Sequence, residues 1–475
     1  LRAGIEIHQQ LDTGKLFCRC PGYLRSDAPD FIIRRKLHKV AGESGEIDAA
    51  VEYEHGLDKE FYYEGYDNNT CLVELDEEPP HEVNIDALNE ALKIALLLNC
   101  EVYPVTQIMR KTVINGSNTS GFQRTVLIAH SGKMETSFGE IGIDGVCLEE
   151  ESARIISKDE KKTVYRLDRL GIPLVEIATA PEMKTPEQVK EVALKLGEIV
   201  RACKVKRGIG TIRQDINVSI KGHDKVEIKG FQEPTIMIKA VQFEAERQIE
   251  ELKNGKKIGE VRNSKLDGST EFLRPIPGKF RMYPETDLPL LKIGREKINE
   301  IKRALPKMKH EIKEELKKKG LSDELINLVL KGNLEEFEIL LRVYNKDVNL
   351  VAKMITLWRN EFASKTKKSF EEIKKILNER VLERILEELI KEKIEGGDVK
   401  KILEKIVNGA SIDEALKVEK AAHDDIEEEI SKIVKEKPGM KENAYMGMVM
   451  AKFKGKLDAR KTMELIKKIL DGKNG

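Results

Sequence analysis

The positions of the prolines divide this chain into two unlike halves. Thirteen of the fifteen prolines lie at or before Pro289, and only Pro306 and Pro438 follow. Because proline lacks a backbone donor and clashes with the preceding helical turn, long helices form where it is absent. Beyond residue 290 the chain is rich in Lys, Glu, Leu and Ile, and apolar residues from Ile373 to Leu389 recur at helical spacing. We therefore predict that the second half is entirely helical.

The first half alternates strand-like and loop-like segments, with a few helices such as one that begins near Asn84. In several of the strand-like segments, apolar residues alternate with acids, amides and cations. A period of two places these polar side chains on one face, as in an antiparallel sheet with one packed and one solvated face. We predict that the first half is α+β, and that the acids, amides and cations on the polar face of its sheet form the floor of a site. The plainer alternative is that each strand has one ordinary solvent-exposed face. The segments are Gly4–Leu11, Leu174–Ala178, Thr211–Ile220 and Lys225–Lys229.

Length and charge limit the organisation of the molecule. A chain of 475 residues is too long for one core and predicts two to four domains, which we place at 1–290, 291–410 and 411–475. The net charge is zero, so no global basic field indicates nucleic acid, although a local patch is compatible with this balance. The longest apolar run, Ile94–Leu98, is too short to span a bilayer, and no leader precedes Gly4. We expect a cytoplasmic protein without a membrane anchor.

The six cysteines follow no spacing typical of a secreted disulfide framework, so we expect reduced thiols. Cys18 and Cys20 are separated by one residue, whereas zinc knuckles use two to four. This spacing argues against a zinc knuckle.

Residues 110–125 combine cations, hydroxyls, amides and two glycines, with almost no apolar content after Ile114. We predict that this segment is neither a core strand nor an amphipathic helix but an ordered loop that offers donors to an anion. Glycines at 116 and 121 would let the backbone approach the ligand closely. A plain solvated loop is the alternative. The cations of the segment are Arg110, Lys111 and Arg124.

The polar strand faces carry many carboxylates and one imidazole, a donor set that suits Mg²⁺ or Mn²⁺ rather than zinc. Its members are Glu6, His8, Glu149, Glu150, Glu151 and Glu176. Arginines such as Arg169 and Arg213 would neutralise phosphate charge, and carboxylate-held Mg²⁺ beside arginines is what phosphoryl transfer needs. No P-loop and no protein-kinase signature occurs, so an ATP site must be of another kind. Taken singly, each of these charges is compatible with a solvated surface.

Eight long motifs resemble the B/E subunit family of tRNA-dependent amidotransferases, and the resemblance covers nearly the whole chain. The motifs are Gly-Ile-Glu-Ile-His-Gln-Gln-Leu (4–11), Lys-Leu-Phe-Cys (15–18), Leu-Asp-Glu-Glu-Pro-Pro-His (75–81), Gly-Ser-Asn-Thr-Ser-Gly-Phe-Gln-Arg-Thr (116–125), Cys-Leu-Glu-Glu-Glu (147–151), Leu-Asp-Arg-Leu-Gly-Ile-Pro-Leu-Val-Glu-Ile (167–177), Ile-Arg-Gln-Asp-Ile-Asn-Val-Ser-Ile (212–220) and Arg-Met-Tyr-Pro-Glu-Thr-Asp-Leu-Pro (281–289). The runs at 76–81 and 116–125 resemble the archaeal E type rather than the B type.

The resemblance implies a fold and a reaction. The fold would be an antiparallel-sheet cradle of the glutamine-synthetase/guanidino-kinase type, followed by all-helical C-terminal domains. The reaction would be phosphorylation of the glutamyl side chain on misacylated Glu-tRNA(Gln), with ATP and Mg²⁺, and displacement of the phosphate by ammonia to give Gln-tRNA(Gln). The ammonia would come through a channel from an asparaginase-like subunit, in a hetero-oligomer with two copies of each subunit.

Carried over to this sequence, the resemblance assigns Mg²⁺ to His8, Glu176 and a glutamate of the 147–151 motif. The family pattern favours Glu150 and strand alternation favours Glu149, so both stay open. The motif ends in Glu151-Ser152, where the family usually has Asp-Ala. The catalytic set is Glu6, His8, Glu150, Glu176 and Arg213. The nucleotide-binding set is Arg110, Lys111, Ser117, Arg124, Arg169, Asp215, Asn217 and Lys229. The tail 445–459, with Lys452, Lys454 and Lys456, resembles the tRNA-contacting helical domain; a surface turn with solvated lysines is the alternative.

This sequence departs from the family pattern at one place. Chains of the E type carry an inserted domain, similar to one in bacterial aspartyl-tRNA synthetases, yet here it is missing near 263–267. We hypothesise that the natural molecule contains further segments. An intact mass of 53.9 kDa, which is the mass of this sequence, would reject the hypothesis.

Two other functions compete with the one that the resemblance implies: an ATP-dependent ligase acting on a free carboxylic acid, and a non-catalytic tRNA-binding scaffold. A free-acid ligase would have little use for a long helical second half, and a scaffold would not need the Glu/His/Arg face.

Overall fold

The computed structural model describes residues 1–39, 41, 45–231, 234–276, 282–416, 423–453 and 459–471. The chain divides into two compact units, Leu1–Lys309 and His310–Gly475. The first unit therefore ends later than the predicted residue 290. The reason is packing: Ile293 and Ile301 are buried in the core of the first unit, the latter on α5 (Arg295–Arg303), and β17 (Leu291–Lys292) pairs with β5 (Val105–Thr106).

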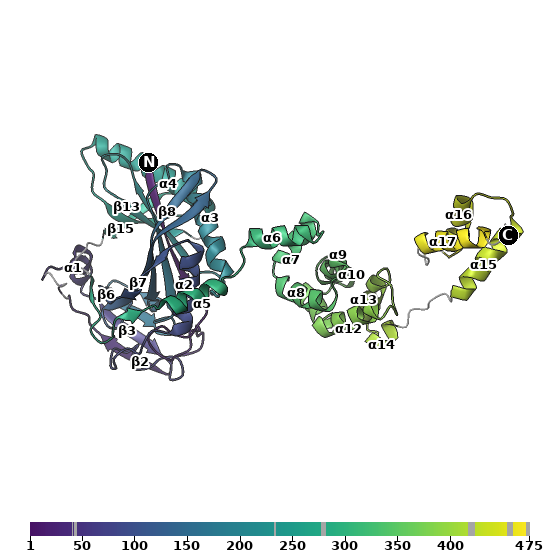
Figure 1. Ribbon diagram of the computed structural model, residues 1–475. Helices are drawn as coiled ribbons and strands as arrows, with labels where there is room; N and C mark the ends of the chain where they lie inside the picture. The colour runs from purple at the N-terminus through teal and green to yellow at the C-terminus, as the bar shows by residue number, and fades with distance from the viewer. Residues whose placement is uncertain are drawn as a thin grey trace. The chain divides into compact units, whose positions relative to one another are not determined.

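An eleven-stranded sheet dominates the first unit (Figure 1). All pairings in it are antiparallel except that between β13 and β14, so the predicted α+β class with an antiparallel-rich sheet is confirmed. In spatial order its strands are β15 (Thr270–Pro275), β14 (Glu260–Ser264), β13 (Val226–Phe231), β12 (Ile212–Ser219), β1 (Arg2–Gln10), β11 (Pro173–Thr179), β8 (Gly139–Glu150), β7 (Phe122–Thr136), β6 (Ile108–Thr112) and β16 (Met282–Pro284), and β4 (Glu101–Val102) pairs with β7.

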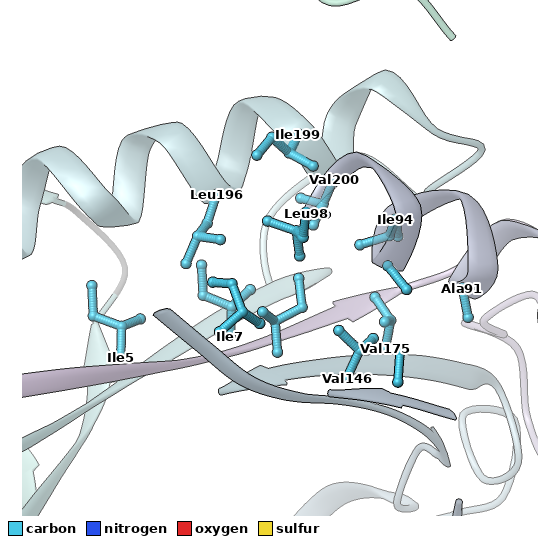
Figure 2. Packing of buried hydrophobic residues seen from close by; sticks show 14 of the residues in the cluster. Ile5, Ile7, Ala91, Ile94, Leu98, Val146, Val175, Leu196, Ile199 and Val200 are labelled. Carbon is cyan, nitrogen blue, oxygen red and sulfur yellow. The ribbon is translucent and has the colours of Figure 1, made fainter. Parts of the chain in front are cut away.

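Three helices pack on one face of this sheet: α2 (Ile85–Leu97), α3 (Pro186–Ala202) and α4 (Pro234–Lys253). As predicted, α2 begins after Asn84, whose side chain caps it by accepting from two backbone N–H groups. The apolar alternation of β1 turns Ile5 and Ile7 toward these helices, where both are buried. Figure 2 shows this layer: Ala91 and Ile94 of α2, Leu98 directly after it, and Leu196, Ile199 and Val200 of α3 lie above Ile5, Ile7, Val146 and Val175. The other face of the central strands is thereby left to polar side chains.

A second, four-stranded sheet has the order β2 (Phe31–Arg35), β3 (Glu60–Gly65), β10 (Lys162–Arg166) and β9 (Arg154–Lys158), and α1 (Ala49–Gly56) lies between β2 and β3 in the chain. Its own small core includes Phe61, Tyr63 and Tyr165. At the position where the inserted domain was expected, β14 and β15 form a hairpin closed by a turn from Lys265 to Ser269.

The prediction that residues 110–125 form one loop is wrong at both ends. Arg110 and Lys111 lie on β6, Arg124 lies on β7, and only residues 113–121 form a loop. Arg110 and Arg124 are direct cross-strand neighbours, an arrangement that would normally repel. Glu285 removes the repulsion, because its carboxylate lies 2.5 Å from Arg110 Nη2 and 2.8 Å from Arg124 Nε. A distant carboxylate thus allows a cationic segment to form strands.

The described part of the second unit contains helices and no strands, as predicted. The prediction of helix alone beyond residue 290 fails at its start, because Leu291–Lys292 forms β17 of the first unit. Its residues bury two separate hydrophobic clusters, one running from Leu316 to Ala415 and one from Ile430 to Ile466. Among the described residues, no helix is long and apolar enough to cross a membrane. The helices are α6 (Lys309–Lys318), α7 (Asp323–Leu330), α8 (Leu334–Val343), α9 (Val348–Ile355), α10 (Leu357–Thr366), α11 (Phe370–Ile376), α12 (Glu379–Ile390), α13 (Val399–Val407), α14 (Ile412–Ala415), α15 (His423–Glu436), α16 (Glu442–Phe453) and α17 (Ala459–Asp471).

Candidate functional site

A cavity of about 1070 Å³ lies over the polar face of the main sheet. Because Ile5 and Ile7 point into the helix-covered core, Glu6 and His8 on the same strand point to the opposite face, where both line the cavity. The predicted one-sided polar sheet is therefore confirmed. Nine of the predicted site residues line this cavity: Glu6, His8, Lys111, Ser117, Glu149, Glu176, Arg213, Asp215 and Lys229.

Glu6, His8 and Glu176 form a compact group in the floor of the cavity. Antiparallel pairing of β1 with β11 sets His8 directly opposite Glu176, and His8 Nε2 lies 3.0 Å from Glu176 Oε2 and 3.9 Å from Glu6 Oε1. One ligand atom from each of the three residues lies within 4.8 Å of the others. Two carboxylates and one imidazole at this separation can hold a divalent cation with a preference for oxygen ligands.

The charges of this group are strongly coupled. Burial alone would lower the pKa of His8, but its hydrogen bond to Glu176 and the charges of Glu176 and Glu6 outweigh burial and raise the pKa of His8 to about 9. Burial raises the pKa of Glu6 to about 7, and the charge of Glu176 adds to the shift. For Glu176, burial is outweighed by Lys111 and His8, which hold its pKa well below the usual range. A proton on His8 therefore occupies the place that a cation would take.

The structure separates the two glutamates that the sequence left open. Glu149 lines the cavity, where its carboxylate accepts from Lys111 Nζ at 2.6 Å and from Gln123 Nε2 at 3.2 Å. Glu150, the next residue on β8, points to the opposite side and accepts from the backbone N–H of Arg124 at 2.9 Å. Strand alternation thus places Glu149 beside Glu176, and the expectation that Glu150 shares this group is corrected.

Cations line the cavity on both sides of the acidic group, and three of them, Lys111, Arg213 and Lys229, have carboxylate partners. Lys111 Nζ also lies 3.5 Å from Glu176. Arg213 makes a bidentate pair with Glu151, at 2.8 and 2.9 Å, and Lys229 Nζ lies 2.6 Å from Asp215. Such pairs hold the cations in fixed positions facing the cavity, the arrangement that lets preorganised charge act on a polyphosphate without reorganisation.

The sequence model of the GatB/GatE catalytic domain matches residues 1–299, a region that contains every residue of the cavity. The chain belongs to the GatB/GatE family. Two relatives are similar along their whole length. A protein of Methanocaldococcus jannaschii is 35% identical over 623 positions, covering 99% of this chain and 98% of the relative. A protein of Pyrobaculum arsenaticum is 32% identical over 606 positions, covering 96% of this chain and 97% of the relative.

A third relative, from Pyrobaculum aerophilum, is 48% identical over 280 residues, which cover 57% of this chain and 46% of the relative. All three relatives are named as the E subunit of glutamyl-tRNA(Gln) amidotransferase. The alignment with the M. jannaschii protein is longer than the 475 residues of this GatB/GatE chain, so it contains long gaps on the side of this chain.

Five predicted site residues of this GatB/GatE chain do not line the cavity: Arg110, Arg124, Glu150, Arg169 and Asn217. For three of them the partners explain why. Arg110 on β6 and Arg124 on β7 both form ion pairs with Glu285. The guanidinium of Arg169 donates to the backbone carbonyls of Ser152 and Ala153. The structure therefore assigns these arginines to the framework around the cavity.

Sequence reasoning missed other cavity residues. Glu227 pairs with Lys229 in the cavity: alternation along 225–229 placed both on the polar face, but only Lys229 was assigned to the site. Arg274 reaches the cavity from β15, and nothing in its local sequence distinguishes it from other arginines.

The expectation that Gly116 lets the backbone approach a ligand meets a different finding. Gly116 has φ 87°, and a Cβ added there would lie 2.1 Å from the ring of Phe61. This glycine therefore serves packing rather than approach to a ligand.

Proposed function

We propose that this chain is the subunit of a tRNA-dependent amidotransferase that phosphorylates the glutamyl side chain of Glu-tRNA(Gln) and presents it to ammonia. The observation that carries the proposal is the pairing of His8 and Glu176, with Glu6 and Glu149, beside Lys111 and Arg213 in one cavity. In the first step the side-chain carboxylate would attack the γ-phosphorus of ATP, and ADP would leave. In the second, ammonia would attack the acyl carbon, and phosphate would leave to give Gln-tRNA(Gln).

The donor set fits Mg²⁺. Oxygen ligands predominate, and the single imidazole lies 3.0 Å from one of the carboxylates, so the group carries excess negative charge once His8 loses its proton. His8, Glu176, Glu6 and Glu149 would hold the ion, which when bound would supply positive charge to neutralise phosphate. The residues of the chain would do the rest: Lys111 and Arg213 would stabilise developing charge, and Glu151 would orient Arg213 through its bidentate pair.

A partner would supply the ammonia. The relatives are named as one subunit of an amidotransferase, which supports an assembly with further subunits. On the resemblance noted above, the partner would be an asparaginase-like subunit, and the assembly would hold two copies of each chain in the cytoplasm. The helical second half would bind the tRNA. Lys452, of its basic tail, lies at the end of α16, whereas Lys454 and Lys456 lie outside the described residues.

The test is an ATPase assay with the chain in its complex, or with ammonium chloride as the nitrogen source. We expect Glu-tRNA(Gln) to stimulate ADP release, and free glutamate not to do so. Stimulation by free glutamate would favour a free-acid ligase, and no ATPase activity with either substrate would favour a scaffold. Tritium-labelled Glu-tRNA(Gln) followed to Gln-tRNA(Gln) would establish the second step.

A further inference from the structure

Two cations of the large cavity lie outside the charge pairs described above. Lys225 directly precedes β13, Arg274 lies on β15, and both line the cavity. Among the residues that the structure describes, the side chain of neither forms a hydrogen bond or an ion pair. We propose that Lys225 and Arg274 bind the phosphodiesters at the 3′ end of the tRNA acceptor strand. The inference rests on the proposed function, because it concerns the second substrate of the same cavity.

The carboxylate of Glu227 shows that the two cations face the same part of the cavity. Glu227 already forms an ion pair with Lys229. Burial would raise the pKa of Glu227, but the charge and the hydrogen bond of Lys229 act against it. The charges of Arg274 and Lys225 lower this pKa further, so both lie close to one carboxylate that has another partner. Cations so placed are available to an anionic ligand, and the planar fork of arginine suits phosphate oxygens.

The register of the main sheet places Arg274 far from the acidic group that would hold the metal. The row of cross-strand partners from β15 to β1 is Arg274, Val261, Glu227, Asn217 and Gly4. Its four steps between neighbouring strands span about 19 Å across the sheet. The row meets β1 at Gly4, four residues before His8, which adds about 13 Å along the strand.

This separation decides which phosphates the two cations would meet. In the proposed function the triphosphate of ATP lies at the acidic group, beside Lys111 and Arg213. Because consecutive phosphates of ATP share one oxygen, a triphosphate at that place would not extend to Arg274. The other substrate is an aminoacylated strand whose carboxylate must also reach the acidic group, and each nucleotide behind it adds a phosphate. Contacts to those phosphates would fix the position of the strand, as phosphate contacts do in other nucleic-acid complexes.

The size and the walls of the cavity suit a second nucleotide. Its volume of about 1070 Å³ exceeds the roughly 300 to 1,000 Å³ of pockets that enclose one drug-sized ligand. Where α1 contacts β15, the lining includes Ala50 and Val51 of α1 and Ile276 directly after β15. An apolar wall beside cations suits a nucleotide, whose base packs on the wall while its phosphate is paired, better than a small inorganic anion.

The test is the affinity of the full chain for tRNA(Gln), measured by filter binding without ATP or ammonia. We expect Lys225→Gln and Arg274→Gln each to raise Kd about tenfold, the equivalent of one charge-assisted hydrogen bond. The double variant should flatten the slope of log K against log salt by about 1.4, because a single strand contributes about 0.7 per phosphate contact. Lys221→Gln, at an exposed lysine that does not line the cavity, is the matched control and should bind as the wild type does.

A second RNA locates the contact. A tRNA(Gln) trimmed of its last three nucleotides lacks the proposed ligand, so the wild type and the variants should bind it equally well. KM for ATP should remain at the wild-type value in both variants. A raised KM for ATP with unchanged Kd for intact tRNA would assign the cations to ATP and overturn the proposal. An equal loss of affinity for intact and trimmed tRNA would also overturn it.

Circular dichroism verifies the folding of the variants. If a variant fails to fold, the wild-type chain provides the test: neutral methylphosphonates in place of the last two phosphodiesters should weaken binding, and unchanged affinity would overturn the proposal. Because binding is measured without ATP, the inference and the proposed function can fail separately. Absence of ATPase activity would refute the proposed reaction, whereas wild-type affinity of both variants for intact tRNA would refute the contact alone.

Discussion

His8 and Glu176 face each other across the antiparallel pair β1–β11, with His8 Nε2 3.0 Å from Glu176 Oε2. The contact joins residues 168 positions apart in the chain. It couples the protonation of the imidazole to a buried carboxylate, because the ion pair favours the charged form of both groups. An incoming divalent cation would compete with that proton for the same ligands.

We predict that His8→Ala and Glu176→Ala abolish phosphorylation of Glu-tRNA(Gln) while leaving the fold intact. Loss of one of the proposed Mg²⁺ ligands should raise the activation free energy by several kcal/mol. ADP release at saturating Mg²⁺ and ATP measures the effect, with circular dichroism to verify folding. His81→Ala, at a partly exposed histidine of the same unit outside the large cavity, is the control. Turnover near the wild-type rate in either variant would rule out the metal assignment.

Metal binding should depend on pH because His8 must lose its proton. Its pKa is about 9 in the metal-free protein, so Mg²⁺ should bind more tightly as pH rises toward 9, with release of a proton below that value. Isothermal titration calorimetry in buffers of different ionisation enthalpy measures the proton. The control is His8→Gln, which should bind weakly with no proton release. A wild-type affinity that is constant from pH 6.5 to 9 would contradict the prediction.

The same shift makes a prediction about stability. The folded pKa of His8 lies above the unfolded value of 6.5, so its imidazolium stabilises the metal-free fold fully below pH 6.5 and loses this contribution as pH rises through about 9. The difference in free energy of unfolding between wild type and His8→Gln, measured with chelator by urea denaturation, should therefore shrink across that range. A constant difference would show that the pair with Glu176 does not stabilise the fold.

Adjacent glutamates on β8 should behave differently. Glu149→Gln should impair Mg²⁺-dependent ATP hydrolysis, because Glu149 faces the cavity. Glu150→Gln should leave KM for ATP unchanged and lower the free energy of unfolding by about 1 to 3 kcal/mol, because it weakens a buried, charge-assisted contact with Arg124. Steady-state kinetics and denaturant unfolding of the matched pair check both statements, and the reverse pattern would restore Glu150 to the site.

Arg213→Lys should reduce activity although it keeps the charge. Lysine cannot reproduce the bidentate pair with Glu151, so the cation would lose its fixed position at the cavity. We expect a loss of about tenfold to a hundredfold in kcat/KM for ATP, the equivalent of one charge-assisted hydrogen bond. Arg201→Lys, on the exposed side of α3, is the matched control. Wild-type kinetics in Arg213→Lys would make Arg213 a framework residue.

Removal of the C-terminal helices should separate tRNA affinity from chemistry. The first helical cluster extends through Ala415, so the deletion should begin after Leu416 to leave that cluster intact. We expect weaker binding of Glu-tRNA(Gln) and unchanged binding of Mg²⁺-ATP. Replacement of Lys452, Lys454 and Lys456 by Gln should flatten the slope of log K against log salt by up to about 3, at roughly 0.9 per lost phosphate contact. Full tRNA affinity after the deletion would remove the tail from the recognition surface.

Patterns that are local in the chain predicted much of the structure. The scarcity of proline after Pro289 predicted the helical second half, and Ile373, Leu377, Val381 and Ile385 are buried as their spacing requires. Alternation placed Glu6 and His8 on one face of β1 and Ile5 and Ile7 on the other. Both patterns succeed because one strand or helix determines the direction of its own side chains.

The sequence by itself thus determined the change from a mixed first half to a helical second half, the polar face and most of its acidic residues, because periodicity is a property of a single element. Only the tertiary structure decided which charges meet. Glu285, far along the chain, forms ion pairs with Arg110 and Arg124, so these arginines support the cavity without lining it. The antiparallel register of β1 and β11 brings Glu176 opposite His8. Folding likewise carries Cys71 to Cys18, a proximity that no spacing rule contained. These contacts depend on the pairing of distant segments, which burial and register set for the whole domain at once.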